Sequence, residues 1–125
     1  MAATATTASI ADPLGNTLYT VTESSTKIAP VALDTTSGTL YAVEIDNTAN
    51  SVASYLHMYN IVVGSVTIGT TLENFTFMAP AGQRITYACP GGHVYTTALT
   101  AGIVSSPGGS VGPSATVTAY VLVNT

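Results

Sequence analysis

The stretch LYAVEIDNTANSVASYLHMY, residues 40–59, decides the expected fold. In its first half, an apolar residue stands at every second position, and Glu44 and Asp46 share the positions between them. Side chains of a strand point to opposite faces in turn, so this alternation predicts a strand with one apolar face. Residues 46–51, DNTANS, predict a turn, because Asn and Asp side chains bond their own backbone. Alternation resumes over 52–59, which predicts two strands joined by a polar turn.

The rest of the chain repeats this pattern. Alternating segments bounded by Gly, Pro, Asn or Asp predict further strands at 18–23, 27–33, 75–78, 85–89 and 115–124, with 94–99 as a strand or one helical turn. Seven to nine short strands without a long helical period are typical of an all-β, antiparallel β-sandwich or barrel. We expect one such domain over residues 12–125. Residues 1–11 are rich in Ala and Thr, and we expect them to form an extended arm, ordered only where something holds it.

Charge is scarce in this sequence. Only 6% of the residues are charged, against about 25% in an average soluble domain. A compact monomer of this mass exposes roughly 6,200 Å², which leaves one charge per roughly 800 Å², about one partner's share of a standard interface. Thr, Ser, Gly and Asn take the place of charge, and such a neutral polar surface suits permanent burial in an assembly.

Several classes of function lack support in the composition. Lys27 and Arg84 are the only two cations, too few for a nucleic-acid surface. No run approaches the roughly 18 apolar residues of a membrane helix. The start of the chain has neither the basic nor the apolar region of a secretory signal, so we expect synthesis in a cytoplasm. Cys89 is the only cysteine, which excludes an internal disulfide, and we expect it to be a small buried side chain.

Two sets of residues invite a catalytic or metal-binding interpretation. Glu44 and Asp46 share a face, and His57 lies across the turn, but oxygen-rich cation sites usually need more than two ligands. A solvated polar face is the favoured alternative. Cys89 and His93 are four residues apart, but the intervening Pro-Gly-Gly prevents the helix that would align them. We therefore predict no catalytic residue, no metal site and no cofactor, and no enzyme activity.

Tyrosines recur in the predicted strands. Their simplest role is packing in the core and across strands. The alternative is contact with other proteins, because tyrosine is enriched in buried interfaces. The side chains that we name as candidate interface residues are Tyr41, Tyr55, His57, Tyr59 and Tyr95.

Short motifs in residues 40–123 resemble small all-β structural proteins of tailed bacteriophages. The matching segments are Glu44-Ile45-x-Asn47, Tyr55-Leu56-x-Met58-Tyr59, Pro80-Ala81-Gly82 and Pro90-Gly91-Gly92. The chain departs from the usual pattern after the tyrosine strand, where IVVGSVTIG (61–69) replaces a proline-bearing linker.

The resemblance implies a component of the virion, made in the host cytoplasm and placed on the capsid surface. Such proteins act as capsid cement or decoration proteins, have jelly-roll-like folds, form homotrimers and bind the major capsid protein across neighbouring capsomers. Cyanophage heads are one setting that it suggests. The arm 1–11 would then add a strand to a neighbouring sheet. The alternative is a fibre-tip or tail-associated module that binds a receptor or glycan through Tyr55, His57 and Tyr59.

Overall fold

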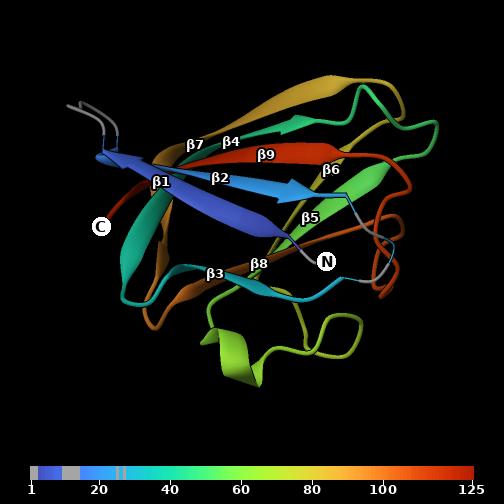
Figure 1. Cartoon of the computed structure of the whole chain (residues 1–125). Helices are drawn as coiled ribbons and strands as arrows, with labels where there is room; N and C mark the ends of the chain where they lie inside the picture. The colour runs from blue at the N-terminus through green and yellow to red at the C-terminus, as the bar shows by residue number, and fades with distance from the viewer. Residues whose placement is uncertain (1–2, 10–14, 25, 27) are drawn as a thin grey trace.

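Nine strands and one short 3-10 helix make up the described chain (Figure 1). The computed structural model describes residues 3–9, 15–24, 26 and 28–125. The elements are β1 (Thr4–Ser9), β2 (Thr17–Glu23), β3 (Val31–Asp34), β4 (Gly38–Asp46), β5 (Ser54–Tyr59), η1 (Val63–Ser65), β6 (Phe75–Ala79), β7 (Arg84–Tyr95), β8 (Leu99–Val104) and β9 (Val117–Asn124).

The strands form two antiparallel sheets that pack face to face. The large sheet has the order β1-β2-β9-β4-β7, and the small sheet has the order β3-β8-β5-β6. Without β1, the remaining eight strands are wound so that the chain passes repeatedly from one sheet to the other, which is the connectivity of a jelly roll. The predicted all-β, jelly-roll-like sandwich is thus confirmed.

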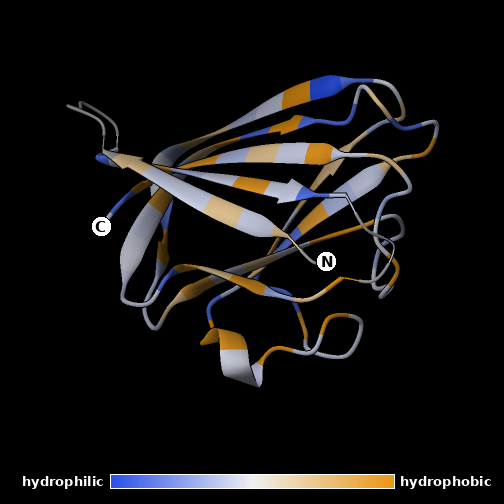
Figure 2. Cartoon of the chain, viewed as in Figure 1, coloured by the Kyte–Doolittle hydropathy of each residue, from blue (hydrophilic) through white to orange (hydrophobic). Residues whose placement is uncertain are grey.

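The core lies between the sheets and follows the predicted alternation. In β9, Val117, Ala119, Val121 and Val123 are fully buried, while the residues between them are half-buried. Figure 2 shows such apolar positions recurring along strands of both sheets. The exposed surface of the chain, 5823 Å², is close to the value that its mass predicts for a compact monomer.

The two strands of residues 40–59 do not pair with each other. β4 pairs with β7 and β9, whereas β5 pairs with β6 and β8 in the other sheet. Asn47, fully buried, organises the crossing: its amide nitrogen donates to the carbonyl oxygens of Val52, Ala79 and Pro80 at 2.9–3.2 Å. The predicted turn is therefore a connection between sheets, held by a buried side chain.

β7 continues through the Pro-Gly-Gly segment that was expected to end it. Leu40 of β4 pairs with His93, and Ala42 pairs with Ala88, so the intervening residues of β7 bulge outward opposite Tyr41. β7 is an edge strand, where a proline and a bulge interrupt few hydrogen bonds. The segment predicted at 94–99 divides between the end of β7 and the start of β8.

Residues 4–9 of the expected N-terminal arm are extended and are held by β2. These residues form β1 and pair antiparallel with β2, from Thr4 opposite Thr22 to Ser9 opposite Thr17. Ala3 and Ala5 pack against the core. The remaining residues of the arm, 1–2 and 10–11, lie outside the described residues.

The two sheets differ in what lies on their outer faces. Residues 60–74 fold over the small sheet, where Val66 and Ile68 join Tyr59 and Val104 in a second apolar cluster. All six residues of β8 are buried in consequence. The outward residues of the large sheet, such as Thr118 and Tyr120, remain half-buried at the surface. The large sheet is thus the broad accessible face of the molecule.

Candidate functional site: the outer face of the large sheet

The outer face of the large sheet divides into a neutral half and a charged half. On β1, β2 and β9 none of the outward-facing residues is charged. They are Thr4, Thr6, Ala8, Leu18, Thr20, Thr22, Thr118, Tyr120, Leu122 and Asn124. We call this surface the threonine face. Glu44, Asp46 and Arg84 lie beside it on β4 and β7.

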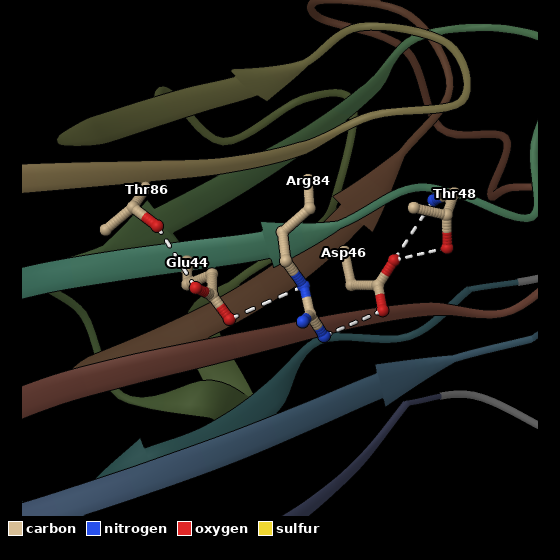
Figure 3. Close-up of polar contacts among 5 residues, drawn as sticks. All are labelled: Glu44, Asp46, Thr48, Arg84 and Thr86. Carbon is tan, nitrogen blue, oxygen red and sulfur yellow. Dashed lines mark hydrogen bonds and ion pairs between the residues drawn. The ribbon is translucent and has the colours of Figure 1, made fainter.

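Arg84 lies between the two carboxylates of the charged half (Figure 3). Its Nη2 donates to Asp46 Oδ2 at 3.0 Å, and its Nε lies 3.6 Å from Glu44 Oε1. The register of the sheet explains this arrangement, because Asp46 is directly opposite Arg84 and Glu44 is its diagonal neighbour. The two carboxylates expected on one face are therefore joined by a cation that lies 38 residues away in sequence from Asp46.

Threonine hydroxyls hold the outer oxygens of this cluster. Thr86 Oγ1 donates to Glu44 Oε2 at 3.1 Å. The hydroxyl and the backbone N–H of Thr48 both donate to Asp46 Oδ1, at 2.6 and 3.1 Å. These two bonds from Thr48, followed by the charge and the hydrogen bond of Arg84, lower the pKa of Asp46. The carboxylate of Asp46 is thus ionised and fixed in direction. The side chain of Arg84 is 51% exposed, so solvent screens the ion pairs and they contribute little to stability.

A shallow hollow of about 300 Å³ borders this cluster. Its lining residues are Leu18, Ala42, Val43, Glu44, Thr86, Tyr120 and Leu122. Glu44 and Tyr120 are directly opposite each other on β4 and β9. The hollow therefore joins an apolar, aromatic wall from β2 and β9 to a polar wall from β4 and β7.

Three of the five candidate interface residues are buried in the chain itself. Tyr59 and Tyr95 are 0% exposed and His57 is 2% exposed. The Tyr95 hydroxyl donates to Asp34 Oδ2 at 2.7 Å, which links the end of β7 in the large sheet to β3 in the small sheet. These three side chains stabilise the monomer and are not accessible to another protein, so they correct the expected interface.

His57 belongs to a buried polar group under residues 60–74. Its Nδ1 lies 3.3 Å from Glu73 Oε1 and 3.0 Å from Thr76 Oγ1. Burial lowers the pKa of His57, and the nearby Glu73 carboxylate partly opposes that shift. Burial, followed by the charge of Glu73, raises the pKa of Tyr59 to about 12. His57 is therefore neutral near pH 7 and does not lie beside Glu44, in contrast to the expected arrangement across the turn.

Tyr41 and Tyr55 keep partial exposure. Tyr55 stacks on the ring of His57 with centroids 6.5 Å apart. Tyr41 lies in the bulge, where it lines a second hollow of about 290 Å³ with Ala88, Cys89, Pro90 and Gly91. Cys89 is 8% exposed, as expected, and burial raises the pKa of its thiol. A protonated thiol is a poor nucleophile, so this second hollow offers packing surface and no evident chemistry.

Within the described part of the chain, no group of three or more His, Cys, Asp or Glu residues could hold a metal ion. The same residues contain no helix long and apolar enough to cross a membrane. Comparisons with protein-family models, with curated proteins and with solved structures found no match. The fold and the geometry of the outer face are therefore the basis for any statement about function.

Proposed function

We propose that this protein is a non-enzymatic component of a virus particle, a decoration protein that binds the major capsid protein at the outer capsid surface. It stabilises contacts between neighbouring capsomers and acts as a homotrimer. The phage-like motifs named above support this proposal, and so does the jelly-roll connectivity, which viral capsid and lectin domains share.

The threonine face carries the proposal. The chain has only eight charged side chains for 5823 Å² of surface, and two of them, Glu23 and Asp34, are buried. None of the eight points outward from β1, β2 or β9. Protein interfaces are depleted of charge at their centres, because an unpaired charge is costly to desolvate. A broad and neutral sheet face meets this requirement, and we assign the capsid contact to it.

β1 contributes a second means of attachment. It is the first strand of the large sheet and pairs on one side only, so the outer edge of its backbone offers N–H and C=O groups to an added strand. A neighbouring chain would bind at this edge by main-chain hydrogen bonds. This replaces the expected role of the arm, since residues 4–9 are the edge of the chain's own sheet. In a trimer, three such weak contacts act together and give high avidity.

Charge substitution on the threonine face tests the assignment. We expect Thr6→Lys and Thr20→Lys together to reduce co-sedimentation with capsids at least tenfold, because neither position is opposite a carboxylate in the sheet and two ammonium groups would be buried without partners. Thr70→Lys adds the same charge to residues 60–74, over the other sheet, and serves as the control. Equal capsid binding by the unchanged protein, the double lysine variant and Thr70→Lys would contradict the assignment of the capsid contact to the threonine face.

The cement role itself is tested on particles. Virions without this protein should lose their genome at a lower temperature than complete virions, and at a low ionic strength that complete virions withstand. Equal resistance of the two particles would exclude a stabilising role. A single mass by light scattering that equals one chain would exclude the trimer.

A further inference from the structure

The hollow beside Tyr120 combines two kinds of surface that seldom occur together on this charge-poor chain. Leu18, Leu122 and the ring of Tyr120 supply apolar surface, and Glu44 with Thr86 supplies oxygen atoms. At about 300 Å³, it lies at the lower end of the size range of ligand pockets. It therefore suits one ring-sized group of a ligand.

Hydrogen-bond acceptors line the polar wall, and the donors of Arg84 lie beside it, next to Glu44. Glu44 is ion-paired with Arg84 and accepts a bond from Thr86, and the Glu44 carboxylate can accept further bonds. Arg84 has five N–H donors and approaches the two carboxylates through Nε and Nη2, which leaves donors directed to solvent. Sugar hydroxyls donate and accept at once, and they need such mixed partners.

Glu44 in the polar wall is oriented without a ligand, because Thr86 holds it within the wall and Arg84 holds it from beside the wall. Arg84 is fixed by the carboxylates of Glu44 and Asp46. Asp46 is fixed in turn by the hydroxyl and the backbone N–H of Thr48 (Figure 3). Side chains that are ordered in advance lose less conformational freedom on binding. Tyr120 adds a rigid aromatic surface with only two rotatable side-chain bonds, against which the C–H face of a pyranose ring can pack.

The charge of the cluster selects the ligand. Glu44 lines the hollow, and Asp46 and Arg84 lie beside it. Together they carry a net charge of −1, which disfavours phosphates, uronic acids and sialic acids. A hard cation needs six to eight oxygen ligands, and both carboxylates here are engaged with Arg84. From this geometry and charge we infer that the hollow on the outer face of the large sheet binds a neutral saccharide. The hollow shares Leu18, Tyr120 and Leu122 with the threonine face, so a saccharide and the capsid would compete for this surface, and the inference is tested on the isolated protein.

Titration of the protein with neutral saccharides, monitored by backbone NMR, tests the inference. The probes are methyl α-glucoside, methyl β-galactoside, methyl α-mannoside and the corresponding trisaccharides. We expect at least one of them to shift the amide signals near residues 18, 42–46, 86 and 120–122 in a saturable way, with a Kd of about 1 mM for a single ring.

Two variants and a control make the test specific. Tyr120→Ala removes the stacking surface and should weaken binding at least tenfold. Thr86→Val keeps the shape of the side chain, removes the hydroxyl that holds Glu44, and should weaken binding several-fold even if Tyr120→Ala folds poorly. Leu72→Ala removes an apolar side chain that is 82% exposed and should leave Kd unchanged.

Three results would overturn the inference. The first is the absence of saturable shifts for every neutral probe at 10 times the expected Kd of about 1 mM. The second is a set of shifts that Tyr120→Ala and Thr86→Val leave unchanged. The third is binding of sialyl or uronic-acid oligosaccharides alone, which would make the ligand an anion.

Discussion

Ser54 Oγ donates a 2.8 Å hydrogen bond to Asn47 Oδ1 inside the sandwich, where both residues are 0% exposed. The bond joins the residue after β4 to the first residue of β5, and so connects strands of different sheets. The backbone N–H of Asn47 also donates to the carbonyl of Gln83, just before β7. Asn47 thus fixes the crossing point of three segments through its side chain and its backbone N–H.

Loss of this amide should be costly. We expect Asn47→Ala to lower the free energy of unfolding by about 3 kcal/mol, because three carbonyl groups and the Ser54 hydroxyl lose a buried partner. Urea denaturation measures the change. Asn124→Ala, at an exposed position of β9, is the matched control and should change the free energy by less than about 0.5 kcal/mol. Equal effects of the two variants would contradict the role of Asn47.

Tyr95 and Asp34 should influence stability at acid pH. Burial alone would raise the pKa of Asp34, but hydrogen bonds from Thr36, Tyr95 and Thr125 outweigh it and lower the pKa. A lowered folded-state pKa gives stability that is present above the unfolded value of 3.8 and is lost as pH falls below it.

Tyr95→Phe removes one of those bonds. We expect a loss of about 1–2 kcal/mol at pH 7 and a smaller further loss between pH 4 and pH 2 than in the unchanged protein. Thermal unfolding across this pH range measures both. Tyr55→Phe is the control, since Tyr55 is partly exposed and is not among the hydrogen-bond partners of Asp34, which are Thr36, Tyr95 and Thr125. An unchanged acid slope would refute the coupling.

His57 should govern stability nearer to neutral pH. Its folded-state pKa lies below the unfolded value of 6.5, so its contribution is complete above pH 6.5 and is lost as pH falls below it. Glu73→Gln removes the group that opposes the shift, and we expect it to steepen the loss of stability between pH 6.5 and pH 5. Thr70→Gln, at an exposed site of the segment that covers His57, should leave the slope unchanged. NMR titration of the His57 ring reads the pKa directly.

Gly92 and Gly91 form a natural matched pair in the bulge. Both have a positive φ, 78° and 79°, which costs an alanine about 1 kcal/mol. A Cβ on Gly92 would lie 2.3 Å from Thr39 Cγ2, whereas a Cβ on Gly91 meets open space. We therefore expect Gly92→Ala to lower the free energy of unfolding by roughly 1–3 kcal/mol more than Gly91→Ala does. Comparable denaturation midpoints would exclude this packing.

Removal of residues 1–9 tests β1. The deletion exposes the edge of β2 and removes the packing of Ala3 and Ala5. We expect the remaining sandwich to unfold cooperatively at a lower temperature, with weaker trimerisation or capsid binding. Calorimetry and co-sedimentation measure the two effects separately. Full capsid occupancy of the shortened protein would contradict the attachment role of β1.

Local alternation predicted the strands and their inward faces well, because it depends on neighbours in sequence. The partner strands of β4 and β5 could not be predicted in this way, since the alternation within a strand does not specify which strand it pairs with. The local sequence likewise predicted Asn47 to be a turn residue, because it does not show that the side chain lies in the core. The contact of Arg84 with Asp46 and the pairing of Glu44 with Tyr120 arise from register alone.

The burial of His57 and Tyr59, which we had expected at an interface, has a separate physical cause. A strand covered on both faces carries apolar residues at all positions, and β5 does so from Tyr55 to Tyr59 with His57 among them. β8, LTAGIV, has the same character. These runs were the available signal that residues 60–74 cover the small sheet and bury His57 and Tyr59.

Because residues 60–74 cover the small sheet and the outer face of the large sheet is open, the molecule has two different faces. Residues 105–112 lie on the covered side, where Ser110 approaches Gly69 of the covering segment. Gly108 lies at an exposed turn of this loop with open space around it. When the threonine face is seated on a particle, a peptide inserted after Gly108 points outward, so the domain can serve as a display platform for antigens or affinity tags.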